Sequence, residues 1–171
     1  PPKKSLGPTL ELGVDISSGE LTPEVLACWA AQGIKCIIVR AANPYDREYE
    51  AKREWAIRQL QAASAGGFAA EVYCWIYFWV NIRPQVEAAV EQADAGGATQ
   101  VWLDAERYLG QAVPTPMANL QTIQQAMIIV MQASLNVGIY TSKREWEAIA
   151  GNSTGFAQVD LWVAAYDGRA E

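Results

Sequence analysis

The chain has 171 residues, 51% of them apolar, which is enough for one well-buried core and too few for two ordinary domains. A formal charge of −6, without any basic run, disfavours nucleic acid and anionic membrane surfaces as partners. The sequence has no histidine, which excludes histidine-based triads, metal sites and pH switches. We expect a single domain over residues 1–171, with residues 1–9 as a lead-in, and acid–base chemistry carried by carboxylates, tyrosine or lysine.

The first part of the chain has the pattern of a strand, a helix and a second strand. Residues 10–16 alternate in polarity and place Asp15 near the end of the predicted strand. A helix should begin after Thr22, whose hydroxyl can cap it, with Pro23 in the first turn. Residues 36–41 form a short apolar run that is typical of a buried parallel strand.

The next stretch repeats this alternation with longer elements. The spacing of apolar residues predicts helices over residues 48–65 and 83–95, each followed by a pair of glycines. Between them, residues 71–80 alternate so that aromatic side chains share one face, which predicts a strand with both faces buried. These aromatic side chains are Tyr73, Trp75, Tyr77 and Trp79.

Residues 101–106 are an apolar run that ends in two carboxylates one residue apart. Positions i and i+2 of a strand share a face, so Asp104 and Glu106 should point to the same side at the carboxyl end of the strand, where α/β proteins place their chemistry. Carboxyl groups roughly 5 to 7 Å apart suit glycoside hydrolysis, where one protonates the leaving oxygen and the other meets the developing positive charge. The alternative is a helix cap followed by a solvated charge.

The rest of the chain completes a pattern of six strands and five helical segments. We predict helices over residues 117–135 and 142–149 and strands over residues 137–140 and 161–166. Alternation of strand and helix is the signature of a parallel α/β fold. The chain lacks the glycine-rich turn of nucleotide-binding sheets, so a β/α barrel is favoured, truncated or open because a closed TIM barrel has eight strands.

The cysteines and the beginning of the chain bear on its cellular setting. Cys28, Cys36 and Cys74 lie in apolar stretches, which favours buried thiols, with a Cys28–Cys36 disulfide as the alternative. The first residues are not followed by the apolar core of a signal peptide, and no apolar run is long enough to span a membrane. A soluble mature domain is therefore expected.

Five short segments occur at strand–helix spacing along most of the chain. They are Leu12-Gly13-Val14-Asp15-Ile16-Ser17, Ile38-Val39-Arg40-Ala41, Val101-Trp102-Leu103-Asp104-Ala105-Glu106, Gly138-Ile139-Tyr140-Thr141 and Leu161-Trp162-Val163-Ala164-Ala165-Tyr166. In this order they resemble glycoside hydrolase family 25, the lysozyme-like muramidases. The resemblance implies an irregular TIM-like β/α barrel that hydrolyses the β-1,4 bond between N-acetylmuramic acid and N-acetylglucosamine. Peptidoglycan glycan strands would be its partner, reached by a secreted protein or by a phage endolysin or virion component.

The resemblance also assigns residues, position by position. Glu106 matches the family's proton donor, Asp104 its partner on the same strand, and Asp15 the aspartate at the floor of the groove. No cofactor is implied, and a small carboxylate cluster without histidine predicts that no metal is required. Substrate-binding aromatic side chains are expected at Tyr73, Trp75, Tyr77, Tyr140, Trp162 and Tyr166.

The chain departs from the family pattern in three places. Cys74 stands where the family often has histidine, Glu71 where it usually has glycine, and the last two strands of the family's barrel have no counterpart before Glu171. Two hypotheses follow. The presence of all three matched acids supports the first, an active muramidase. The missing strands support the second, a catalytically weak or inactive barrel that serves as a glycan-binding or structural module.

Overall fold

The computed structural model describes residues 12–108 and 114–164, in which six strands alternate with five α-helices. The strands are β1 (Leu12–Ile16), β2 (Ile34–Arg40), β3 (Ala69–Trp75), β4 (Gln100–Asp104), β5 (Asn136–Thr141) and β6 (Asp160–Val163). The helices are α1 (Pro23–Ala31), α2 (Tyr49–Ala65), α3 (Ile82–Gly96), α4 (Pro116–Gln132) and α5 (Lys143–Ala150). The predicted lead-in, residues 1–9, lies outside the described residues.

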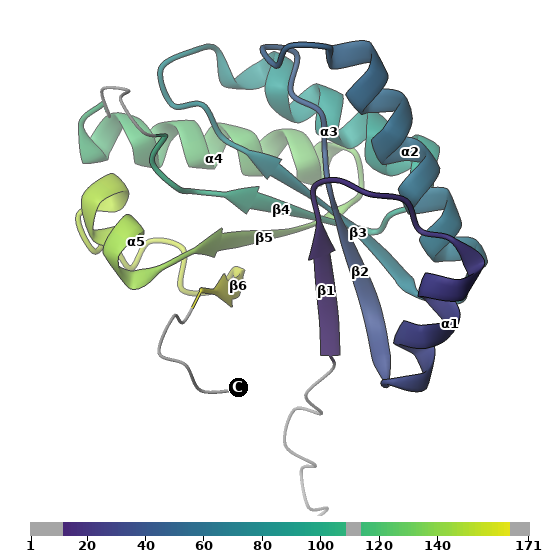
Figure 1. Cartoon of the computed structure of the whole chain (residues 1–171). Helices are drawn as coiled ribbons and strands as arrows, with labels where there is room; N and C mark the ends of the chain where they lie inside the picture. Colours follow the sequence, from purple (N-terminus) through teal and green to yellow (C-terminus); the bar gives the residue numbers. More distant parts are fainter. Residues whose placement is uncertain (1–11, 109–113, 165–171) are drawn as a thin grey trace, which may run out of the picture.

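The six strands are parallel and pair in sequence order, from β1 to β6. A doubly wound sheet would reverse its strand order at a switch point, and this sheet does not. Figure 1 shows the sheet curling into a half-barrel, with the helices on its outer, convex side. The predicted α/β fold, a TIM-like barrel that is incomplete, is therefore confirmed.

Alternation along the strands separates two faces of the sheet. Side chains of the convex face pack under the helices and are fully buried, among them Ile37, Val39, Val72, Val101 and Leu103. The side chains between them in sequence point to the concave side. The strand register sets Arg40 beside Tyr73, and sets Asp104 between Trp75 and Tyr140.

Short polar side chains fix the helix starts. The hydroxyl oxygens of Thr22, Thr115 and Ser142 accept backbone N–H bonds in the first turns of α1, α4 and α5. The predicted helix start at Thr22 is confirmed. Helix α4 ends at Gln132, three residues earlier than predicted, because Ser134 has a left-handed backbone with φ of 61° that no helix can continue through.

The aromatic strand is shorter than predicted. β3 ends at Trp75, and residues 76–80 form a turn that leads into α3. The side chain of Gln85 holds this turn, because its amide oxygen accepts the Tyr77 N–H at 2.9 Å and its amide nitrogen donates to the Tyr77 carbonyl at 3.1 Å. The prediction was wrong because a helix side chain, rather than a neighbouring strand, satisfies this backbone. The concave side of β3 is also half-buried rather than buried.

The cysteine prediction holds for one residue of three. Cys74 is buried, Cys36 is half-buried and Cys28 is exposed, and no disulfide joins Cys28 to Cys36. No helix within residues 12–108 and 114–164 combines the length and apolar composition that a membrane crossing needs.

Candidate active site

The three carboxylates singled out in the sequence lie at the same end of the sheet. Asp104 is the last residue of β4, Glu106 follows just beyond the strand, and Asp15 lies at the end of β1. The Asp104 carboxyl interacts electrostatically with both Glu106 and Asp15, so the concave face brings the three together. They differ in exposure: Asp15 is exposed, Glu106 is half-buried, and Asp104 is only 4% exposed.

Asp104 is a buried acid with an unmet hydrogen-bonding atom. Its Oδ1 has no hydrogen-bond partner among the described residues. Burial, followed by the negative charge of Glu106, raises the pKa of Asp104 to about 8, against the opposing effect of Arg40. Asp104 therefore keeps its proton at neutral pH. A carboxylic acid held neutral in this way can donate a hydrogen bond or a proton.

Arg107, the residue after Glu106, is held by Glu145 of α5, and this pair is called here the Arg107–Glu145 clamp. The carboxylate of Glu145 accepts the backbone N–H of Arg107 at 3.0 Å, and also Nε and Nη2 of the Arg107 guanidinium at 2.8 and 2.9 Å. These bonds lower the pKa of Glu145 and keep it ionised. Burial raises the pKa of Glu106, and the charge of Glu145 adds to this effect. Sequence analysis missed the clamp because its two residues lie 38 positions apart.

The Arg40 guanidinium, on β2, lies near this cluster and interacts with Asp104. The Arg40 guanidinium lies over the Trp75 ring, 5.1 Å from its centroid, and lowers the pKa of Asp104 and of Tyr73. Burial is the larger effect on Tyr73 and raises its pKa to about 12, so that its hydroxyl stays neutral. Arg40 thus links the carboxylates to the aromatic side chains of β3.

Four aromatic side chains form a cluster on one side of the carboxylates, called here the aromatic platform: Trp75, Tyr77, Trp79 and Tyr108. Tyr77 and Trp79 stack with centroids 5.1 Å apart, and the Tyr108 ring lies 5.7 to 5.9 Å from the other three. Trp79 is 37% exposed and Tyr108 43% exposed. Neither was predicted as a site residue; the available signals were the aromatic alternation for Trp79 and proximity to Glu106 for Tyr108.

A second aromatic group lies on the β5 side of Asp104. The Trp162 ring lies 4.4 Å from Tyr140 and 5.8 Å from Trp102, between centroids. The Trp102 indole N–H donates to Glu71 at 2.6 Å. Tyr140 and Trp162, two of the aromatic side chains expected to bind substrate, therefore lie together, whereas Tyr166 lies outside the described residues.

The ring of Tyr77 belongs to the aromatic platform, but its hydroxyl group points to Asp46. Its hydroxyl donates to Asp46 Oδ1 at 2.7 Å, so that group is already engaged within the fold. Tyr77 is also buried, so Trp79 and Tyr108 are the members of the platform that a ligand can reach most easily.

The chain is similar to proteins described as lysozymes. A family model described as "Lysozyme-like protein 1" matches residues 7–171. A "Probable GH family 25 lysozyme 3" of Dictyostelium discoideum is 29% identical over 160 residues, which cover 91% of this chain but only 32% of that protein. A "Probable GH family 25 lysozyme 2" of the same organism is 30% identical over 160 residues, covering 92% of this chain and 73% of the relative.

One solved structure supports the same fold. A glycosyl hydrolase 25 of Streptococcus pneumoniae, described as a virulence factor that participates in host cell invasion, superposes with a TM-score of 0.60 at 16% sequence identity. The match covers 92% of this chain and 69% of that structure.

Proposed function

The chain belongs to the lysozyme-like family of the glycoside hydrolase family 25 type, and from this premise we propose that it is a muramidase. Its proposed substrate is the β-1,4 bond between N-acetylmuramic acid and N-acetylglucosamine in peptidoglycan, at the bacterial cell wall. The observation that carries the proposal is the pair of acids at the end of β4, Asp104 and Glu106, flanked by aromatic side chains on both sides. Two carboxyl groups in different environments are what glycoside hydrolysis requires.

Glu106 is the proposed proton donor to the leaving glycosidic oxygen. It is half-buried and lines a shallow polar pocket beside α5, so a substrate can reach it. Burial and the charge of Glu145 raise its pKa and so favour the protonated form that a general acid needs. The reaction should therefore slow as the pH rises and Glu106 ionises.

Asp104 and Asp15 are the proposed stabilisers of positive charge at the sugar. Asp15 is exposed, whereas Asp104 can contribute negative charge only after losing its proton. Since the charge of Glu106 raises the pKa of Asp104, Asp104 holds its proton more tightly when Glu106 is ionised. The platform and the Tyr140–Trp162 pair would hold sugar rings through apolar contact.

A second candidate function is glycan binding without turnover. It is favoured by the burial of Asp104, whose 4% exposure keeps a substrate away from one of the two acids. The aromatic side chains would then serve binding alone.

The test is the release of reducing ends from purified bacterial peptidoglycan across a pH series. Glu106→Gln keeps the shape of the side chain but cannot donate the proton, so its rate should fall by roughly 10²- to 10⁴-fold at an unchanged melting temperature. The matched control is Glu87→Gln, at an exposed position on α3 paired with Arg83, which should keep the wild-type rate.

Mass spectrometry of the products identifies the bond that is cleaved. A muramyl residue at the new reducing end supports the proposed specificity. Wild-type protein that binds peptidoglycan but releases nothing at any pH supports the binding function instead. A Glu106→Gln variant at the wild-type rate refutes the assigned proton donor.

A further inference from the structure

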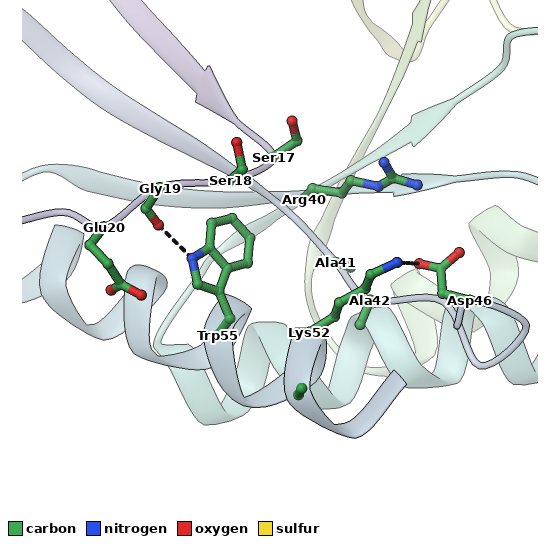
Figure 2. A pocket seen from close by; sticks show the side chains of 11 residues that line it. Ser17, Ser18, Gly19, Glu20, Arg40, Ala41, Ala42, Asp46, Lys52 and Trp55 are labelled. Atoms are coloured by element: carbon green, nitrogen blue, oxygen red, sulfur yellow. Dashed lines mark hydrogen bonds and ion pairs between the residues drawn. The ribbon is translucent and has the colours of Figure 1, made fainter. Parts of the chain in front are cut away.

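A pocket of about 340 Å³ opens at the ends of β1 and β2, against the first turns of α2 (Figure 2). Its floor is apolar and is formed by Ala41, Ala42 and Ala51. Trp55 makes one wall and is fixed there, because its indole N–H donates to the Gly19 carbonyl oxygen at 2.6 Å. The pocket is therefore a defined feature of the fold, adjoining the carboxylate cluster.

The two acids that line this pocket are already paired. Glu20 lies 3.6 Å from the guanidinium of Arg58. Asp46 accepts the Tyr77 hydroxyl at 2.7 Å and lies 4.0 Å from the Lys52 ammonium. These carboxylates are thus neutralised or hydrogen-bonded within the fold, which reduces their repulsion of an incoming anion.

Among the charged side chains that line the pocket, Arg40 is the one without an ion pair among the described residues. Apart from the Trp75 ring, its guanidinium has neither an ion pair nor a hydrogen bond among the described residues. A guanidinium has five N–H donors in a planar fork that matches the two oxygens of a carboxylate. Figure 2 shows Lys52 ending at Asp46, whereas the Arg40 guanidinium reaches toward the same side of the pocket without meeting any of the other side chains drawn there.

We propose that this pocket is a subsite for a carboxylate carried by the glycan, bound by Arg40 above the alanine floor. The inference rests on the proposed function, because it names a substituent of that substrate. A muramyl sugar carries a lactyl arm with one methyl group and one carboxyl group, and a peptide attached to that arm can supply a carboxylate instead. Both sources offer an anion for Arg40 and apolar atoms for the floor.

Occupation of this subsite would act on the neighbouring acids. Arg40 lowers the pKa of Asp104, and an anion bound to Arg40 would offset that positive charge. A bound carboxylate therefore raises the pKa of Asp104 and helps it to keep its proton. This gives the subsite a readout in the titration of Asp104, besides binding itself.

The test is NMR titration of the full chain with three sugars. N-acetylmuramic acid carries the free lactyl carboxylate, muramyl dipeptide carries its carboxylate on the peptide, and N-acetylglucosamine carries neither. Wild-type protein should bind at least one carboxylate sugar about tenfold more tightly than N-acetylglucosamine, as expected for a charge-assisted bidentate pair. The tighter of the two carboxylate sugars identifies the source of the anion.

Three variants separate the pocket from charge in general. Arg40→Gln should abolish the preference for carboxylate sugars. Ala51→Leu should weaken their binding by filling the pocket from an exposed position of α2 that does not support the core. Arg83→Gln, which removes the same charge from an exposed site on α3, should keep the preference.

Equal affinity of the wild type for all three sugars overturns the proposal, and so does an Arg40→Gln variant that keeps the preference. None of these readouts needs turnover. A protein that prefers carboxylate sugars but does not cleave peptidoglycan supports the subsite and refutes the hydrolase. A protein that cleaves peptidoglycan but shows no preference for carboxylate sugars supports the hydrolase and refutes the subsite.

Discussion

The two faces of the sheet are formed by alternate residues of the same strands, yet they differ in chemistry. On the convex face, side chains such as Val72, Val101 and Leu103 are aliphatic and fully buried. The concave face holds three of the four buried side-chain polar atoms that have no hydrogen-bond partner in the described part of the chain: Trp75 Nε1, Gln100 Nε2 and Asp104 Oδ1. The convex face holds the fold together, while the concave face keeps buried polar atoms without hydrogen-bond partners beside the carboxylates.

This contrast has an energetic consequence. A buried polar atom without a partner costs about 1 to 3 kcal/mol, whereas a buried aliphatic side chain stabilises by a similar amount. Substitutions on the convex face should therefore change stability, and substitutions on the concave face should change binding and protonation.

The convex face gives the largest expected loss of stability. Leu103→Ala should lower the free energy of unfolding by about 2 to 5 kcal/mol, because Leu103 is fully buried and the truncation leaves a cavity. Urea denaturation measures the change, and the matched control is Leu161→Ala on β6, where the leucine is 59% exposed. Equal losses in the two variants would remove the contrast between the faces.

The concave face should make stability depend on pH through Asp104. Its folded pKa of about 8 lies above the ordinary value of 3.8, so the native state binds the proton more tightly than the unfolded chain. The stability gained is present in full below pH 3.8 and is lost as the pH rises through about 8, by at most about 6 kcal/mol. Asp104→Asn should flatten this decline in a series of denaturation curves, and Asp94→Asn, at an exposed position on α3, should not. An unchanged slope in Asp104→Asn would show that Asp104 titrates normally.

The clamp on α5 should have the smallest effect on stability. Glu145→Gln removes a partly exposed ion pair with Arg107, which is worth roughly 0.2 to 1 kcal/mol. It also removes a negative charge that raises the pKa of Glu106, so the Glu106 carboxyl should titrate at lower pH by NMR. Glu147→Gln, at an exposed position of the same helix, serves as the control. A rise in the pKa of Glu106 would contradict the role given to Glu145.

The parts of the molecule that could be predicted from sequence are those set by local pattern. The run that ends in Asp104 and Glu106 marks a strand and its carboxyl end without knowledge of any neighbour. Thr22 likewise marks a helix start through a bond to a backbone N–H three residues on. Parallel strands then bring their carboxyl ends to one edge, which explains why acids from β1 and β4 meet.

What could not be predicted depends on contacts between distant residues. The end of β3 is set by Gln85 on the following helix, and no pattern within the strand shows it. Gly138 sits in β5 because a Cβ there would collide with the Trp102 ring of β4. The open donors of Arg40 are visible only once the positions of all nearby carboxylates are known.

The most direct test of the central claim, that the concave face holds a carboxylic acid neutral at physiological pH, is an NMR titration of the Asp104 carboxyl carbon. The signal can be assigned by its loss in Asp104→Asn. We predict a midpoint near pH 8 in the wild type, and a lower one in Glu106→Gln, where the neighbouring negative charge is gone. A midpoint near the ordinary value of 3.8 that does not move in Glu106→Gln would contradict the claim.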